Sequence, residues 1–171
     1  MYLIRHCPTE WNTLARLQGL NNLPISPLTD EDLIAIEKNK HEVESLVNPK
    51  IITSELIRTQ QTAIAYGFDK FSVDPTTNEL DFGPYEGRGL PELINETGAA
   101  WLSDPRSLVL GERMVDFEAR LFEVLERYQS AGAVILFGHG AVIRGLCAIA
   151  KSGNISGMNS ITVPNNQMII M

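Results

Sequence analysis

Residues 1–12 read MYLIRHCPTEWN, a short apolar run followed at once by a cluster of reactive and charged side chains. The run at 2–4 is typical of a buried strand, because turn-forming residues bound it and nothing polar interrupts it. Pro8 ends the strand, since proline has no N–H to donate to a neighbouring strand. The strand therefore delivers Arg5 and His6 at its carboxyl end.

A second segment repeats this design far along the chain. Residues 133–137 form another apolar run, AVILF, and Gly-His-Gly follows it at 138–140, before a predicted helix over 141–151. Ligands of α/β proteins bind beyond the carboxyl ends of the strands. The chain has only three histidines, so the matched positions of His6 and His139 predict that both face one crevice.

The composition is that of an ordinary globular protein, with 44% hydrophobic and 20% charged residues. A length of 171 residues suits one domain, 1–171, with a sizeable core. The net charge of −7 disfavours nucleic acid or an anionic membrane as the main partner. Cys7 and Cys147 form neither a disulfide framework nor a zinc pattern, and no membrane span or signal peptide is evident. A cytoplasmic protein is therefore expected.

Apolar periodicity and turn residues predict the secondary structure. The predicted strands cover 2–4, 50–53, 71–73 and 133–137. The predicted helices cover 30–47, 54–66, 112–128 and 141–151. Alternating strands and helices predict an α/β fold, a three-layer α/β/α sandwich with a mostly parallel central sheet.

Local signals add detail to this scheme. Ser54 is expected to cap the second helix, and Asp116 is expected to pair with Arg120 at i,i+4. Residues 160–171 are expected to end the chain as an antiparallel hairpin at one edge of the sheet. Residues 83–111 form a loop-rich insertion with one or two short helices, of the kind that is usually functional when it is packed.

Arg58 and Glu79 complete a set of side chains suited to phosphate chemistry. Arg58 falls in the first turn of its helix, where free N–H groups and the helix dipole favour an anion. Glu79 opens the glycine-rich loop, where a carboxyl group can approach a ligand. Arginine binds phosphate oxygens in pairs and keeps its charge. Two arginines, two histidines and a carboxylic acid supply a charge clamp, a nucleophile and a proton donor.

A metal site is the alternative explanation for two histidines and a carboxylate. The adjacent arginines would repel a cation, and no further Asp or His cluster is spaced to complete a ligand shell. We therefore expect neither a metal nor another cofactor. Asp81 and Glu86 are the reserve candidates for the acid.

Four separate blocks resemble the histidine phosphatase superfamily, in its phosphoglycerate-mutase-like branch 1. The opening RHCPTEWN at 5–12 resembles the family's Arg-His-Gly signature followed by Glu-Thr-x-x-Asn. The other blocks are TSELIRTQQTA at 53–63, ELDFGPYEG at 79–87 and FGHGAVIR at 137–144. Shorter matches are Gln18-Gly19 and Leu23-Pro24-Ile25. The blocks follow the family's order and span nearly the whole chain.

The resemblance implies a role for each matched residue. His6 would be the nucleophile that carries the phosphoryl group, and Glu79 would be the proton donor. The phosphate would be bound by Arg5, Arg58 and His139, and the pocket would be lined by Asn12, Gln18 and Gly19.

These roles place one requirement on the ring of His6 and one on the backbone at Cys7. A histidine nucleophile must be neutral at its attacking nitrogen, with the other nitrogen donating to a fixed acceptor. A backbone carbonyl just beyond His6 is the expected acceptor. Cys7 stands where the family signature has glycine, so the backbone there must accept a side chain.

Three functions fit these residues. The first is a metal-independent phosphatase that hydrolyses a small phosphomonoester through a phosphohistidine. The second is a phosphoglycerate mutase, but family mutases have a longer, more basic insertion, whereas Arg88 and Arg106 are the only basic residues between 87 and 111. The third is a catalytically weak module that only binds a phosphorylated ligand. The substrate, expected to be a small phosphorylated metabolite, is open among sugar phosphates, sugar acid phosphates, α-ribazole phosphate and nucleotides.

Overall fold

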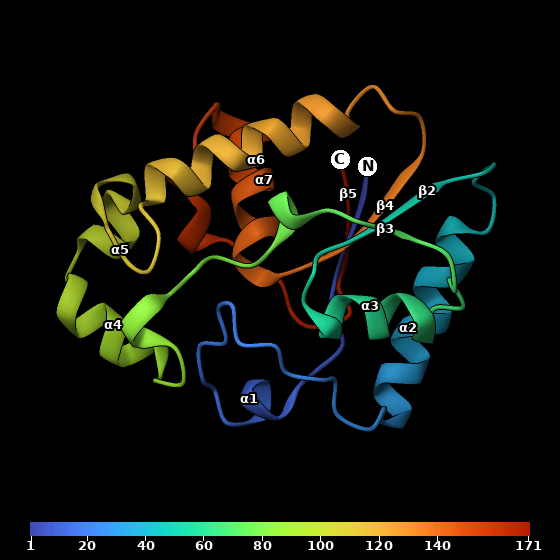
Figure 1. The fold of residues 1–171 in the computed structure, drawn as a ribbon, viewed down its shortest axis with the longest axis horizontal. Helices are drawn as coiled ribbons and strands as arrows, with labels where there is room; N and C mark the ends of the chain where they lie inside the picture. Colours follow the sequence, from blue (N-terminus) through green and yellow to red (C-terminus); the bar gives the residue numbers. More distant parts are fainter.

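A five-stranded sheet forms the centre of the computed structural model, which describes residues 1–171 (Figure 1). The strands are β1 (Tyr2–Arg5), β2 (Lys50–Thr53), β3 (Ser72–Val73), β4 (Val134–Gly138) and β5 (Met168–Ile170). Their order across the sheet is β3-β2-β4-β1-β5, and only the pair of β1 with β5 is antiparallel. The carboxyl ends of β1 and β4 therefore lie side by side, and the predicted mostly parallel sheet is confirmed.

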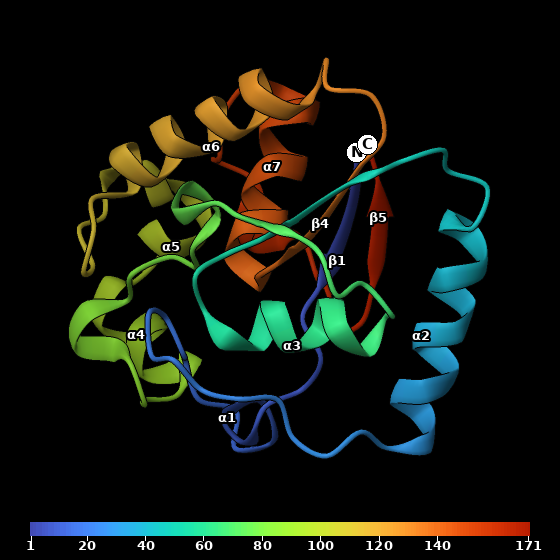
Figure 2. The same cartoon turned by 45° about the vertical axis from the view of Figure 1, so that its right-hand side comes forward.

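Helices cover both faces of this sheet (Figure 2). One face carries α2 (Asp30–Val43) and α3 (Ile57–Ala65), and the other carries α6 (Met114–Tyr128) and α7 (Gly140–Ser152). Successive side chains of β1 supply both layers, because Leu3 joins the core beneath α6 and α7 while Ile4 joins the core beneath α2 and α3. The three-layer α/β/α prediction is confirmed. None of the helices has the length and apolar character that a membrane crossing needs.

The insertion packs beside the loop that follows β1. It contains α4 (Leu90–Thr97) and α5 (Ala100–Ser103), and α1 (Glu10–Thr13) lies in the neighbouring loop (Figure 1). Arg16 forms a β-bridge with Gly89, and the N–H of Leu17 donates to the carbonyl of Arg88 at 2.9 Å. Short 3₁₀ turns occur at Pro75–Thr77, Gly83–Tyr85, Pro105–Ser107 and Met158–Ser160. The two loops together form a wall next to the strand ends.

Two predictions about helix ends were wrong. The helix α2 ends at Val43, four residues before the predicted end at 47. The helix α3 begins at Ile57, because Oδ1 of Asn22 accepts its N–H at 2.7 Å. Ser54, the expected cap, lies three residues before this start, where its hydroxyl accepts the N–H of Leu56 at 3.1 Å and also contacts His139.

The predicted C-terminal hairpin was also wrong. Only Met168–Ile170 forms a strand there, and it pairs with β1. The segment before this strand contacts Arg5 instead. The carbonyl of Val163 accepts the Nη1–H of Arg5 at 2.6 Å. Pro164 has no N–H with which to continue a strand.

Candidate active site

His6 and His139 are adjacent at the carboxyl ends of β1 and β4. The N–H of His6 donates to the carbonyl of Gly138 at 2.9 Å, which extends the strand pairing by one residue. The two rings meet edge to face, with centroids 5.5 Å apart. Both side chains are buried, with exposures of 2% and 0%. The parallel pairing of two apolar strands thus brings together residues that are far apart in the sequence.

His6 is held in the tautomer that a nucleophile needs. Its Nδ1 lies 2.7 Å from the carbonyl oxygen of Cys7, and Nδ1 must carry the proton because a carbonyl only accepts. This is the backbone acceptor that the sequence leads us to expect, and it leaves Nε2 unprotonated. Burial lowers the pKa of His6 well below its ordinary 6.5, and the charges of Arg58 and Arg5 lower it further. The ring is therefore neutral at neutral pH.

His139 contacts Arg58 and Ser54 and does not line the cavity. Its Nδ1 accepts from Nε of Arg58 at 3.2 Å, so its Nε2 donates to Oγ of Ser54 at 2.8 Å. Burial, followed by the charge of Arg58, lowers the pKa of His139 well below 6.5. Both ring nitrogens are engaged in this arrangement. Direct binding of phosphate by His139, which the resemblance implies, stays a prediction.

Arg58 lies in the first turn of α3, as predicted, with its guanidinium fully buried. It donates through Nη1 to the carbonyl of Asn21 at 2.7 Å and through Nη2 to that of Gly19 at 2.8 Å. Burial lowers the pKa of Arg58 to about 10, so it stays charged at neutral pH. At Gly19, φ is +51° and a Cβ would lie 1.8 Å from Oε1 of Glu86, so a side chain there would displace the Glu86 carboxylate. Gly19 therefore positions Arg58 rather than lining the pocket.

The two buried neutral histidines predict a loss of stability on acidification. Below pH 6.5 the unfolded chain binds protons that folded His6 and His139 do not, so unfolding becomes more favourable. Between pH 6.5 and the lowered folded pKa, each histidine should remove up to about 1.4 kcal/mol of unfolding free energy per pH unit. Urea unfolding at several pH values measures this slope.

The control for this prediction is a double variant, His6→Gln with His139→Gln. It should show a shallower pH slope than the wild-type chain between pH 6.5 and 5. An equal slope in both proteins would mean that carboxyl groups alone cause the acid sensitivity.

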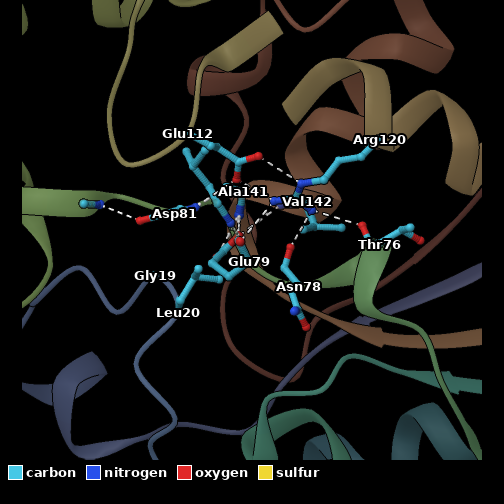
Figure 3. A network of polar contacts seen from close by, with 12 residues as sticks. Gly19, Leu20, Thr76, Asn78, Glu79, Asp81, Glu112, Arg120, Ala141 and Val142 are labelled. Carbon is cyan, nitrogen blue, oxygen red and sulfur yellow. Dashed lines mark hydrogen bonds and ion pairs between the residues drawn. The ribbon is translucent and has the colours of Figure 1, made fainter. Parts of the chain in front are cut away.

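Glu79 reaches the same site and is held by the start of α7 (Figure 3). Its Oε1 accepts from the N–H groups of Leu80, Ala141 and Val142 at 3.0, 3.1 and 3.3 Å. Its Oε2 has a single contact, with the N–H of Ala141 at 3.2 Å. Oε1 therefore fixes the direction of the carboxyl group, and Oε2 is the oxygen left to exchange a proton with a ligand.

The side chain of Arg120 holds the backbone around Glu79 (Figure 3). It donates to the carbonyls of Thr76, Asn78 and Glu79 at 3.0, 2.6 and 3.0 Å. Its Nε and Nη2 donate to the carboxylate of Glu112 at 3.1 and 2.7 Å, which uses all five of its N–H groups. Sequence reasoning missed this positioning residue.

Glu112 is the other partner in this network. The predicted ion pair of Arg120 with Asp116 was wrong. Glu112 bonds Arg120 and also accepts the N–H of Asp81 at 2.9 Å, so the pair holds the chain on both sides of the proposed acid. Asp116 instead lies 3.7 Å from Arg113. Arg120 pairs with Glu112 rather than with Asp116 at i,i+4, because the Glu112 carboxylate, just before the helix, accepts two of its N–H groups.

Cys7 is accepted without strain at the position of the signature glycine. Its side chain is fully buried in the core beneath α2 and α3, and its φ is not positive. The Cys7 N–H donates to Oγ1 of Thr62 at 2.9 Å, and Sγ donates to Oδ1 of Asn166 at 3.0 Å. Burial raises the pKa of the thiol to about 11, so it stays protonated at neutral pH. Cys7 is a packing residue that also fixes the loop after β1.

These elements enclose a cavity of about 330 Å³. The predicted site residues that line it are Arg5, His6, Asn12, Gln18, Arg58 and Glu79. His139 and Gly19 do not line it. Residues without a predicted role that do line it include Arg16, Arg144 and Asn159. The signal for Arg144 was its place in the FGHGAVIR block, about one helical turn beyond His139.

Neither reserve acid lines the cavity. Asp81 accepts the N–H of Gly83 at 2.8 Å, and Glu86 accepts the N–H of Leu20 at 2.8 Å and a bond from the Asn21 side chain. Both carboxylates therefore shape loops around the site. Among the carboxyl groups, Glu79 alone lines the cavity.

Comparisons with known proteins agree with this arrangement. A family model described as Histidine phosphatase superfamily (branch 1) matches residues 1–171. Probable phosphoglycerate mutase GpmB of Cronobacter sakazakii is 39% identical over 99 residues, which are 56% of this chain and 45% of that protein. This chain thus spans about half the length of the curated relative that it matches.

Solved structures match along nearly the whole chain. A Thermus thermophilus protein, TTHB049, is 28% identical with a TM-score of 0.73, and the match covers 98% of this chain and 89% of that one. The alpha-ribazole phosphatase from Shigella flexneri is 23% identical with a TM-score of 0.76, covering 98% and 87%, and shows the shared fold. With the family model matching all 171 residues, the chain belongs to branch 1 of the histidine phosphatase superfamily.

Proposed function

We propose that this chain is a metal-independent phosphatase that hydrolyses a small phosphomonoester through a phosphohistidine on His6. The observation that carries the proposal is the state of His6, whose ring is neutral and keeps Nε2 free at the wall of the cavity. Arg5 and Arg58 line the same cavity and supply positive charge for the phosphoryl oxygens. A module that only bound phosphate would need no free nucleophilic nitrogen.

The geometry supports a reaction in two steps. Nε2 of His6 attacks phosphorus while the bond from phosphorus to the ester oxygen breaks, and Glu79 gives its proton to the leaving alkoxide. Glu79, now a carboxylate, then takes a proton from the water that attacks the phosphohistidine. This second step releases inorganic phosphate and restores neutral His6 and protonated Glu79. Throughout, Nδ1 of His6 keeps its proton on the carbonyl of Cys7.

The insertion favours water as the final acceptor over a retained sugar acid. Arg88 forms ion pairs with Glu92 at 2.9 Å and with Glu96, and Arg106 pairs with Glu118 at 2.9 Å. Neither arginine lines the cavity. The insertion therefore adds no basic side chain that could hold a bisphosphorylated intermediate. Similarity to a probable phosphoglycerate mutase keeps mutase activity as the alternative to be assayed.

A panel of phosphomonoesters, assayed with and without EDTA, tests this function. No group of three or more His, Cys, Asp or Glu side chains is arranged to hold a metal ion. We expect at least one alkyl phosphate to be hydrolysed at a rate that prolonged chelation leaves unchanged, since arginines supply the positive charge.

The same panel separates the alternatives. Activity lost in EDTA and restored by one divalent ion would make a metal enzyme the better account. Bisphosphoglycerate-dependent mutase turnover faster than hydrolysis would identify a mutase. Binding without turnover of any ester would leave the binding module.

A further inference from the structure

Arg144 has no partner in the protein although it lies inside the cavity. It projects from α7 into the cavity wall, and none of its nitrogens forms a hydrogen bond or an ion pair. Its Nε is buried and unsatisfied. Burial lowers the pKa of Arg144, and the charge of Glu79 opposes that effect without contact. The side chain as a whole is partly exposed to the cavity, so its guanidinium is free to bind an anion there.

Arg144 stands next to Arg5 but is not one of the residues that frame the nucleophile. A Cβ at Gly140 would lie 3.5 Å from Nη1 of Arg144 and 3.5 Å from Cζ of Arg5, so the two cations flank the start of α7. Arg16 adds a third cation at an exposed position of the cavity wall. With Arg58, four arginines line a cavity whose single carboxyl group is that of Glu79, in a chain whose net charge is −7. One phosphoryl group does not account for this excess.

We propose that Arg144 binds a second oxyanion of the substrate, so that the substrate is a phosphomonoester that also carries a carboxylate or a second phosphoryl group. The proposal rests on the proposed function of the same cavity, in which Arg5 and Arg58 hold the phosphoryl group that is transferred. The paired N–H groups of a guanidinium suit both oxyanions. Oδ1 of Asn159 lines the same wall, buried and without a partner, so it can accept a bond from a substrate hydroxyl.

The competing possibility is that Arg144 contacts the transferred phosphoryl group itself. The two roles differ in what the ligand must carry. A contact with the phosphoryl group affects every phosphate ligand equally, whereas a second subsite affects only ligands with a second charge. Binding of non-hydrolysable ligands separates the roles without any need for turnover.

Titration calorimetry with phosphonates tests the subsite. The ligands are methylphosphonate, which has no second anion, phosphonoacetate and 3-phosphonopropionate, which add a carboxylate, and methylenebisphosphonate, which adds a phosphoryl group. Arg144→Met keeps the length of the side chain and removes the charge. We expect it to lose about 10- to 100-fold in affinity for the better of the two-anion ligands, and little for methylphosphonate. Arg144→Lys should recover part of the loss.

Arg113→Met is the matched control, because Arg113 is 64% exposed, lies outside the cavity and carries the same charge. It should bind every ligand as the wild-type chain does. Arg144→Met should also leave the Tm unchanged or raise it, since the substitution breaks no hydrogen bond or ion pair within the protein and removes a charge whose Nε is buried without a partner. A Tm loss with equal weakening of all ligands would mean that Arg144 is structural.

The remaining outcomes also decide the proposal. Equal losses at unchanged Tm would place Arg144 on the transferred phosphoryl group and overturn the second subsite. No wild-type preference for a two-anion ligand over methylphosphonate, or no effect of Arg144→Met, would overturn it too. Failure to hydrolyse any phosphomonoester would refute the phosphatase function alone, because the binding difference is measured without turnover.

Discussion

His6→Ala is expected to abolish turnover and, with it, the acid-labile phosphoenzyme that rapid quenching should trap from the wild-type protein. The substitution removes Nε2, the only atom that we assign to carry the phosphoryl group between the two steps. A water molecule should not replace it, because Glu79 must give its proton to the leaving alkoxide in that step and so is not available as the base for water. Rapid quenching with ³²P-labelled substrate, followed by peptide mapping, measures the adduct.

His41→Ala is the control for this experiment. His41 is exposed on α2, with 84% of its side chain accessible, and does not line the cavity. It should leave both the rate and the adduct unchanged. A His6→Ala protein that folds normally and still forms the adduct on another residue would show that His6 is not the nucleophile.

The positions of both site histidines could be predicted because they depend on short-range signals. A buried strand is recognised by a few consecutive apolar residues, and the residue after its end follows from the same pattern. Thr29 likewise caps α2 through a local contact, since its partner, the N–H of Asp32, is only three residues away. Where a contact is local, the sequence carries nearly all of the information about it.

The support of the site could not be predicted, because its partners are distant in the sequence. Arg120 bonds carbonyls more than 40 residues away, and those carbonyls belong to residues whose side chains give no hint of the contact. Ser54 accepts the nearby N–H of Leu56, but it also bonds a histidine 85 residues away, which its local sequence does not indicate. Backbone carbonyls are present at every residue, so no sequence pattern marks the ones that a distant arginine will use.

Arg144 lies between these two cases. Its residue type and its place five residues beyond His139 are visible in the sequence, but its lack of a partner is a property of the folded chain. An unpaired cation can be recognised only after every neighbour has been placed. Specificity is therefore harder to predict than the nucleophile, whose position follows from the local pattern of β1.

Glu79→Gln is expected to slow hydrolysis of alkyl phosphates by about 10²- to 10⁴-fold, the usual contribution of general acid–base catalysis. A leaving alkoxide needs its proton early, whereas a nitrophenolate needs almost none. The loss on p-nitrophenyl phosphate should therefore be much smaller in the step that phosphorylates His6. That step is measured from the burst or from a single turnover, since Glu79 also serves as base for water in the second step.

In this structure, Glu79→Gln tests directly whether the proton of the Glu79 carboxyl group is needed. Oε1 accepts the N–H groups of Leu80, Ala141 and Val142, and the amide oxygen of glutamine can keep these bonds. The main loss is therefore the exchangeable proton of Oε2, whose single contact is the N–H of Ala141. Glu126→Gln, at an exposed position of α6, is the matched control and should behave as the wild-type chain does. Equal losses on both esters in the first step would mean that Glu79 only positions the substrate. The acid would then have to be Asp81 or Glu86, and either would need to leave the loop contacts that now hold it away from the cavity.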